Sequence, residues 1–235
     1  MAAGRVSRVA ERSSKQLLYP SRPAWVQLVC PAPKRYLQEL IRTNDLRTGL
    51  DIGCGEGSPL ASLRATAFRS TGIDISSENL AASRDRNTHD EYILGDFRSA
   101  KLDGKFDVVV LSHVIEHFTR DEGEKVLRRA ESLAQRLVYV ETPNGFLEQL
   151  ATAQNPFEQL LSGWFPHDFE ARGYTVFGSG PYFLRNRLIS GGTIPGHLAA
   201  LIGRALQRWY FRRPTHAAII AAIRLVDERG NIRRC

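Results

Sequence analysis

The sequence predicts an α/β fold in which a mostly parallel sheet is covered by helices on both faces. Short apolar strands alternate with helical stretches from residue 49 onward, and the first strand runs into a glycine-rich turn at residues 53–57. The strand at residues 106–111 (FDVVVL) is apolar almost throughout, which is typical of a sheet buried on both faces. In open sheets of this kind, ligands bind at the carboxyl ends of the strands.

Local patterns predict the elements in order. Tyr36, Leu37, Leu40 and Ile41 recur at helical spacing, which predicts an amphipathic helix over residues 31–42. A serine at 76 or 77 is the expected cap of a later helix, because its hydroxyl can accept a hydrogen bond from a free backbone N–H group. The further strands are expected at 49–52, 71–75, 92–94, 106–111, 137–140 and 174–177, and the further helices at 59–67, 76–87 and 121–133.

Composition restricts the class of protein. The chain has 235 residues, of which 43% are hydrophobic and 24% charged, as in one larger globular domain. No apolar run reaches the roughly 18 residues of a membrane-spanning helix. Three widely spaced cysteines, Cys30, Cys54 and Cys235, build neither a disulfide framework nor a zinc site. We therefore expect a reducing compartment and a cytoplasmic location.

Charge is distributed unevenly along the chain, whose net charge is +7. Residues 1–48 carry 9 basic and 3 acidic side chains, residues 49–182 carry 13 and 20, and residues 183–235 carry 10 and 2. This layout predicts a basic N-terminal arm and helix (1–44), an acidic core (45–182) and a basic helical insertion with a final strand in the same domain (183–235). Basic ends leave nucleic acid and anionic membranes open as partners.

Residues 191–213 are expected to form part of that insertion as an amphipathic helix. Leu198, Leu201, Ile202, Leu206 and Trp209 share one helical face, whereas Arg204 and Arg208 lie on the other. Such a helix can contact a membrane peripherally, cover a substrate or pack on the body of the domain. The apolar stretch 216–226 that follows is compatible with either helix or strand when taken alone.

The glycine-rich turn belongs to the stretch GLDIGCGEG at residues 49–57. Gly53 and Gly55 let the backbone approach a ligand where a Cβ atom would collide. The dinucleotide fingerprint G-x-G-x-x-G is not complete, because Ser58 stands at its third glycine. Asp51 precedes the turn, and a carboxylate there suits a ligand with an ammonium group better than a diphosphate.

At these residues the chain resembles the class I S-adenosylmethionine-dependent methyltransferases, over roughly residues 45–182. Asp74 ends the second strand about twenty residues after the glycines, and the triplet Gly95-Asp96-Phe97 follows the third strand. The segment Ser112–His117 (SHVIEH) follows the fourth strand. More loosely, residues 141–182 are similar to bacterial methyltransferases associated with surface polysaccharides, glycolipids and secondary metabolites.

The resemblance implies a seven-stranded sheet whose last strand is antiparallel and inserted beside the fifth, which assigns residues 216–226 to the seventh strand. It implies S-adenosylmethionine as the methyl donor, with Asp74 at the ribose hydroxyls and Asp96 at the adenine amine. The implied acceptor pocket is formed by Asn144, Phe146, Trp164, Phe165 and His167. The implied cofactor-binding residues are Asp51, Gly53, Cys54, Gly55, Asp74, Ile75, Asp96, Phe97 and Leu111.

Methyl transfer to a hydroxyl needs alignment of the reacting atoms and a base near neutral pH, for which histidine is the usual side chain. The candidates are His113, His117 and His167, with His113 the first choice because it follows the fourth strand. His113, Glu116 and His117 also share the spacing of a metal site. The ubiquinone-pathway O-methyltransferases and small-RNA 3′-terminal methyltransferases that use this position have Glu in place of His113, so we expect no metal.

The resulting hypothesis is methyl transfer to a small molecule, at a hydroxyl oxygen of a sugar, glycolipid or natural product. One alternative is an RNA methyltransferase, which the basic ends favour and the lack of a recognisable RNA-binding module disfavours. Another is a non-catalytic S-adenosylmethionine-binding partner subunit, against which the intact glycine turn and both acidic anchors argue. A homo-oligomer is compatible with the sequence.

Overall fold

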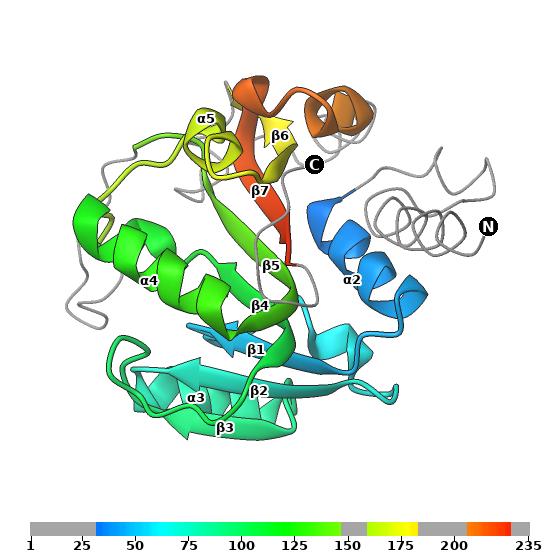
Figure 1. Ribbon diagram of the computed structural model, residues 1–235, viewed down its shortest axis with the longest axis vertical. Helices are drawn as coiled ribbons and strands as arrows, with labels where there is room; N and C mark the ends of the chain where they lie inside the picture. The colour runs from blue at the N-terminus through cyan, green and yellow to red at the C-terminus, as the bar shows by residue number, and fades with distance from the viewer. Residues whose placement is uncertain (1–31, 147–158, 183–205, 227–235) are drawn as a thin grey trace, which may run out of the picture.

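The computed structural model describes residues 32–146, 159–182 and 206–226. The predicted N-terminal arm and the first part of the basic insertion lie outside these ranges. Over the described residues, seven strands form one sheet in the order β3-β2-β1-β4-β5-β7-β6 (Figure 1). The strands are β1 (Thr48–Ile52), β2 (Arg69–Asp74), β3 (Glu91–Leu94), β4 (Phe106–Ser112), β5 (Ala134–Pro143), β6 (Thr175–Pro181) and β7 (Ala217–Leu225).

The strand directions confirm the expected class I methyltransferase fold. β1 to β5 pair in parallel, and β7 pairs antiparallel with both β5 and β6. The carboxyl ends of β4, β5 and β6 therefore lie at the same edge of the sheet as the amino end of β7. The apolar stretch that could have been helix or strand is β7. Its backbone pairs with β5 and β6, and its alternating apolar side chains enter the cores on the two faces of the sheet.

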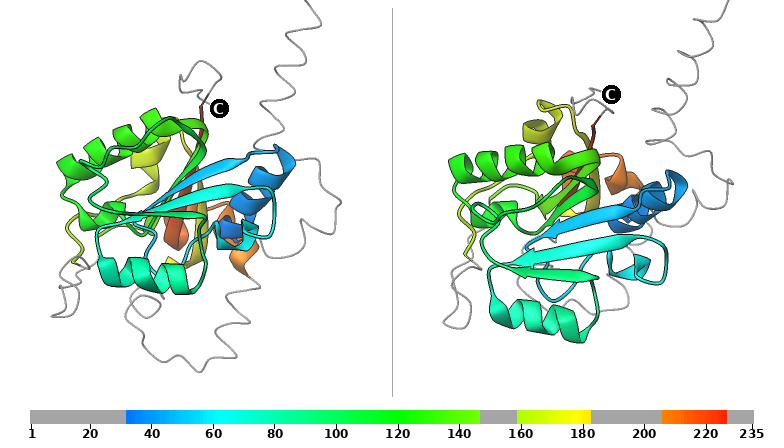
Figure 2. Two further views of the ribbon diagram at one scale, coloured as in Figure 1. Left: turned by 90° about the horizontal axis from the view of Figure 1, so that it is seen from below. Right: turned by 60° about the horizontal axis from the view of Figure 1, so that its bottom comes forward.

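Two hydrophobic cores cover the two faces of the sheet. Along β4, Val109 and Leu111 belong to one core and Val108 and Val110 to the other, as the two-residue period of a strand requires. The first core contains buried residues of α4 (Arg120–Leu133) and α5 (Pro166–Glu170), and the second contains those of α2 (Pro33–Thr43). Figure 2 shows α4 and α2 on opposite sides of the sheet. The expected burial on both faces is confirmed.

A hydroxyl cap starts α3 (Ser77–Asp85) where the sequence predicts it, and a second one, which the sequence analysis did not single out, starts α4. The Ser76 hydroxyl accepts a hydrogen bond from the Asn79 N–H group at 3.2 Å and begins α3. At α4, Thr119 and Glu122 form a capping box, in which each side chain binds the backbone of the other residue.

The prediction of an α-helix over residues 59–67 is wrong. The segment contains only the 3-10 turn η1 (Ala61–Leu63) and further turns, with i to i+3 hydrogen bonds such as Leu63 N–H to Leu60 O at 2.9 Å. The Ser58 hydroxyl accepts from Leu60 N–H, and the Thr66 hydroxyl donates to Leu63 O. Local side-chain bonds of this kind compete with an α-helix, while Leu60 and Leu63 are still buried.

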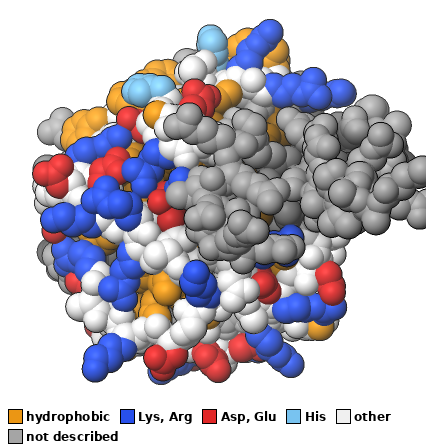
Figure 3. Space-filling model, viewed as in Figure 1, with side chains coloured by type: hydrophobic (Ala, Val, Ile, Leu, Met, Phe, Trp, Pro, Cys, Tyr) orange, Lys and Arg blue, Asp and Glu red, His pale blue; other side chains and the backbone are white. Residues whose placement is uncertain are grey.

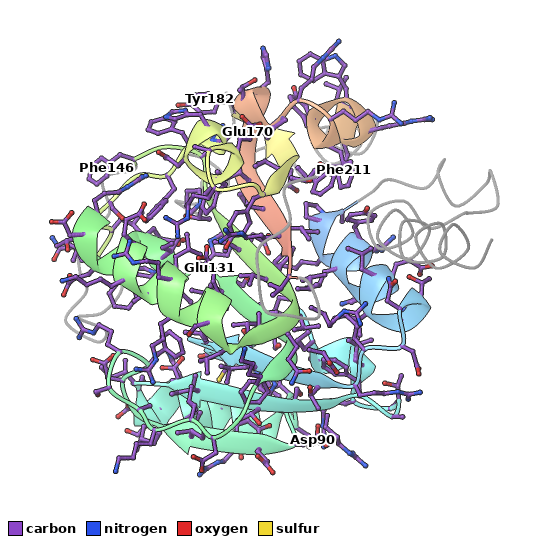
Figure 4. The ribbon with its side chains drawn as sticks, viewed as in Figure 1. Asp90, Glu131, Phe146, Glu170, Tyr182 and Phe211 are labelled. Carbon is purple, nitrogen blue, oxygen red and sulfur yellow. The ribbon has the colours of Figure 1, made fainter. Side chains whose placement is uncertain are left out.

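One ion pair joins α4 to the last strand. Arg224 lies in β7 and is only 6% exposed, and its guanidinium contacts the carboxylate of Glu131, which Figure 4 labels on α4. The same carboxylate accepts a hydrogen bond from Tyr174 Oη at 2.9 Å and lies 3.2 Å from Arg172. The only charged side chain of the otherwise apolar β7 is thereby neutralised inside the domain.

Among the described residues, none of the helices is long and apolar enough to cross a membrane.

Candidate functional site

A cavity of about 600 Å³ opens at the carboxyl ends of β1, β2, β3 and β4. The glycine turn after β1, the ends of β2 and β3, and the segment after β4 each supply part of its wall. α2 and residues 159–161 close the opposite side. The lining residues are Lys34, Ile52, Gly53, Cys54, Gly55, Gly57, Ile73, Asp74, Ile75, Asn79, Gly95, Asp96, Phe97, Arg98, Ser112, His113, Val114, His117, Phe118, Glu122, Gln159 and Leu161.

The glycine turn is bound to the end of β2 through Asp74. One carboxylate oxygen of Asp74 accepts from the Gly55 N–H group at 2.8 Å, and the other accepts from the Ser76 N–H group at 2.9 Å. Gly53 and Gly55 have φ angles of 62° and 52°, which a side chain disfavours. A Cβ atom on Gly53 would also lie 2.6 Å from Val114 Cγ2. The turn therefore requires glycine for its conformation and for its packing.

Asp96 is held by the neighbouring arginine. Both of its carboxylate oxygens accept from Arg98, and these hydrogen bonds hold the pKa of Asp96 below its ordinary value. Ile75 is 43% exposed at the cavity, while Phe97 is 5% exposed. A carboxylate next to two apolar side chains suits a flat ring that bears an amine.

Two of the predicted cofactor-binding residues do not line the cavity. Leu111 is fully buried in the first core. Asp51 is 1% exposed, and its carboxylate lies 3.5 Å from Nε2 of His89, whose Nδ1 lies 3.0 Å from the Ser70 hydroxyl. The Asp51 carboxylate faces a buried histidine beneath the turn, and its contact with a ligand ammonium stays a prediction.

Cys54 lines the cavity through the turn, but its thiol is buried. Burial, together with the negative charges of Asp51 and Asp74, raises the pKa of Cys54 to about 12. Its sulfur lies 4.0 Å from the Ser83 hydroxyl. A protonated, buried thiol is not a nucleophile, so Cys54 contributes shape to the site.

His113 occupies the loop directly after β4 and lines the cavity. Its backbone has a φ angle of 58°, and its N–H group donates to Glu141 O at 2.8 Å. Nδ1 of His113 lies 3.2 Å from Oε1 of Glu116, a residue that is 3% exposed. Burial lowers the pKa of His113, but the hydrogen bond and charge of Glu116, with the charge of Glu141, outweigh it and raise the pKa above its ordinary value.

His117 also lines the cavity, but it does not join His113 and Glu116 in a metal site. Its Nδ1 lies 3.0 Å from Gln159 O. The segment is the 3-10 turn η2 (Ile115–His117), so the helical spacing expected for these side chains does not apply. Within the part of the chain that the structure describes, no group of three or more His, Cys, Asp and Glu side chains could hold a metal ion.

The aromatic segment 164–169 packs away from the cavity. Trp164 is fully buried, its Nε1–H group donates to the Ser162 hydroxyl at 3.0 Å, and its ring contacts Phe169. The His167 side chain is 76% exposed and stacks on Phe165. Neither these residues nor Asn144 and Phe146 are among the cavity lining, so the described cavity does not contain the acceptor pocket expected from them.

The opposite wall contains residues that the sequence analysis did not single out. Lys34 of α2 lies 3.6 Å from a carboxylate oxygen of Glu141, which also accepts from Tyr139 Oη at 3.1 Å and Ser112 Oγ at 3.2 Å. Glu141 is 5% exposed. A buried glutamate in an apolar strand was the only sequence signal here, because Lys34 reaches the site from a distant segment.

Parts of the chain are similar to known methyltransferases. Residues 50–152 match a family described as methyltransferase domain. The ubiquinone biosynthesis O-methyltransferase of Caulobacter vibrioides is 33% identical over 134 residues, covering 52% of each chain. The cypemycin N-terminal methyltransferase of a Streptomyces species is 34% identical over 87 residues, covering 36% of each. The chain thus spans at most about half the length of the curated relatives that it matches.

The fold is similar to that of solved methyltransferases. The crystal structure of the plantazolicin methyltransferase, in complex with a pentazolic desmethyl analogue and S-adenosylhomocysteine, superposes with a TM-score of 0.53. The two chains are 16% identical, and the superposition covers 96% of this chain and 92% of the other. At this identity the likeness establishes the fold.

Proposed function

We propose that the chain transfers a methyl group from S-adenosylmethionine to a hydroxyl oxygen of a small molecule, since residues 50–152 match a family described as methyltransferase domain and the sheet has the strand order of the class I fold. A sugar, a glycolipid or a natural product is the acceptor class that we favour. The observation that carries the proposal is one cavity that joins the glycine turn, Asp74 and Asp96 to His113.

The residues of the cavity fit the methyl donor. The glycine turn leaves backbone space beside Gly55 and Gly57, where a Cβ atom would meet almost nothing within 4 Å. Asp74 offers carboxylate oxygens to vicinal hydroxyls, and Asp96 with Ile75 suits an adenine ring and its amine. When bound there, S-adenosylmethionine would supply the transferable methyl group on a sulfonium, an excellent leaving group.

His113 is the base in this proposal. Glu116 holds Nδ1 of the imidazole, which leaves Nε2 to accept the proton of the acceptor hydroxyl as its oxygen is methylated. The negative charge of Glu116 also stabilises the imidazolium that results. Glu116 touches neither substrate nor donor in this scheme and is a positioning residue for His113.

The acceptor side of the cavity supports a small molecule with both polar and apolar parts. Lys34, Ser112 and His113 present polar groups, whereas Phe118 and the 45%-exposed Leu161 present apolar surface. The names of the two curated relatives refer to ubiquinone biosynthesis and to the N-terminus of cypemycin. The choice of oxygen as the acceptor atom therefore depends on His113, not on the relatives.

Calorimetric titration with S-adenosylhomocysteine tests the donor site first. We expect one site per chain with a dissociation constant in the micromolar range or tighter. Screening of hydroxylated acceptors with labelled S-adenosylmethionine then tests turnover. Binding without turnover on any acceptor class would favour a non-catalytic partner subunit, and methylation of RNA alone would replace the small-molecule assignment. Absence of binding would overturn the proposal at its first step.

A further inference from the structure

The short helical segment 206–211 and the turn that follows it carry an exposed face that the methyltransferase site does not use. We name this exposed set of side chains the cationic aromatic face. It consists of Leu206, Arg208, Trp209, Arg212, Arg213 and His216. Figure 1 places this helix (orange) beside the start of β7. In the same view, Figure 3 shows hydrophobic and basic side chains next to each other at the top of the molecule.

The opposite side of the helix fixes its orientation on the domain. The Gln207 amide donates to Gly178 O at 3.1 Å and accepts from the Gly180 N–H group at 3.0 Å. Tyr210 is 6% exposed, and the Phe211 ring, labelled in Figure 4, stacks on Phe177 with centroids 4.6 Å apart. Because this inner side is anchored to β6, the cationic aromatic face has to point away from the domain.

The positive charge of the face has no ion-paired carboxylate among the residues that the structure describes. Residues 183–226 include seven arginines and neither aspartate nor glutamate. Arg224, which lies in β7, pairs with Glu131 inside the domain. Among the described residues, no carboxylate forms an ion pair with Arg208, Arg212 or Arg213 (the ion pairs of the domain lie elsewhere). An anionic partner would therefore meet uncompensated positive charge.

Apolar side chains are interleaved with these arginines. Leu206 is 39% exposed and Trp209 is 40% exposed, one helical turn apart. Arg213 lies over the Trp209 ring at 4.6 Å, while Tyr210 and His216 contact the ring edge-on at 4.9 and 5.2 Å. A tryptophan flanked by arginines is typical of the boundary between lipid headgroups and acyl chains, where the ring and the charge are both accommodated.

We propose that the cationic aromatic face binds the surface of an anionic membrane. A nucleic acid would need an open aromatic face on which a base can stack, and Arg213 already covers one face of Trp209 while Tyr210 and His216 crowd the ring. A lipid surface instead takes the exposed ring edge and Leu206, and it neutralises the three arginines. The face lies at the amino end of β7, the same edge of the twisted sheet as the cavity. The proposal does not depend on the acceptor or on turnover.

Co-sedimentation of the whole chain with lipid vesicles tests the proposal. We expect binding to phosphatidylcholine vesicles that contain about 30% phosphatidylglycerol, weak binding to phosphatidylcholine alone, and release at about 0.5 M salt. The variant R208Q/R212Q/R213Q should reduce the affinity for the anionic vesicles about tenfold or more. Trp209→Ala should weaken binding at every salt concentration, since it removes apolar insertion and keeps the charge.

The matched control is R42Q/R84Q/R128Q, which removes the same charge from exposed arginines on α2, α3 and α4. It should bind vesicles like the wild type. The proposal would be overturned if the control lost as much vesicle affinity as R208Q/R212Q/R213Q does. It would also be overturned if the wild type bound uncharged and anionic vesicles equally well. So would tight binding of a single-stranded RNA oligonucleotide that is lost in R208Q/R212Q/R213Q while the vesicles stay unbound. The affinity of each variant for S-adenosylhomocysteine is measured in parallel. An unchanged affinity shows that the variant is folded, and this readout does not depend on vesicle binding.

Discussion

Nδ1 of His113 and Oε1 of Glu116 lie 3.2 Å apart beside the cavity, with the carboxylate almost completely buried. The second oxygen of Glu116 has no hydrogen-bond partner among the described residues. The interaction with the His113 ring is therefore the side-chain hydrogen bond of this buried carboxylate among the described residues. It connects the geometry of the loop after β4 to the basicity of the proposed catalytic histidine.

Glu116→Gln should lower the pKa of His113, because the hydrogen bond and charge of Glu116 raise it. In the wild type, the raised pKa of His113 stabilises the folded state. This contribution is fully present below the ordinary histidine pKa of about 6.5, and it is lost as pH rises through the pKa of His113 in the folded state. The variant should shift the acid limb of the turnover profile to lower pH. NMR titration of the His113 ring measures the pKa directly, with Glu39→Gln as the control. An unshifted titration would contradict the pairing.

His113→Asn should remove the proposed base while preserving the backbone. Asparagine tolerates the left-handed conformation at φ 58° better than alanine does. We expect turnover on a hydroxyl acceptor to fall by about 10²–10⁴-fold, with the affinity for S-adenosylhomocysteine changed by less than about twofold. The control is His216→Asn, an exposed histidine outside the cavity. Normal turnover in His113→Asn would exclude this residue as the base.

Asp74→Ala should weaken binding of S-adenosylhomocysteine about tenfold or more, equivalent to about 1.4 kcal/mol. The variant loses the carboxylate offered to the ribose and the bonds to the Gly55 and Ser76 N–H groups. Calorimetry of this variant beside Asp103→Ala, an exposed aspartate in a loop, measures the effect. Equal affinity of the two variants would remove Asp74 from the donor site.

Gly72→Ala should destabilise the domain by about 1–3 kcal/mol. A Cβ atom there would lie 2.6 Å from the His89 ring and 2.8 Å from the Cys54 sulfur, both of which are buried. Gly57→Ala is the control, because its Cβ atom would meet nothing within 4 Å, and it should change the free energy of unfolding by less than about 0.5 kcal/mol. Urea denaturation distinguishes the two; equal stability would mean that the His89 ring can move aside.

Glu131→Gln should cost about 3 kcal/mol of stability, because it leaves Arg224 buried without its carboxylate. The control is Glu170→Gln on the exposed side of α5, labelled in Figure 4. It removes the same charge at an exposed position outside this ion pair. The free energies of unfolding of the two variants, measured in urea, should differ by about 3 kcal/mol. A stability equal to that of Glu170→Gln would mean that Tyr174 or water satisfies the arginine instead.

Local sequence patterns were sufficient for much of the fold and for the glycine turn that lines the cavity. The two-residue period of β4, the serine before α3 and the glycines at 53 and 55 each act within a few residues. Their structures therefore follow from chain geometry and from hydrogen bonds to near neighbours. The position of β7 beside β5 came from the resemblance to a known family, since its apolar run is compatible with either helix or strand.

The tertiary structure decided which polar groups meet, because that depends on segments far apart in the chain. Only packing shows that Asp51 faces His89, that Trp164 is a core residue and that His167 lies outside the cavity. Packing also brings Lys34 to Glu141, more than a hundred residues away. The sequence by itself determined the α/β fold class and the glycine turn after β1. The packing of distant segments decided that His113 and His117 line the cavity and that His167 does not.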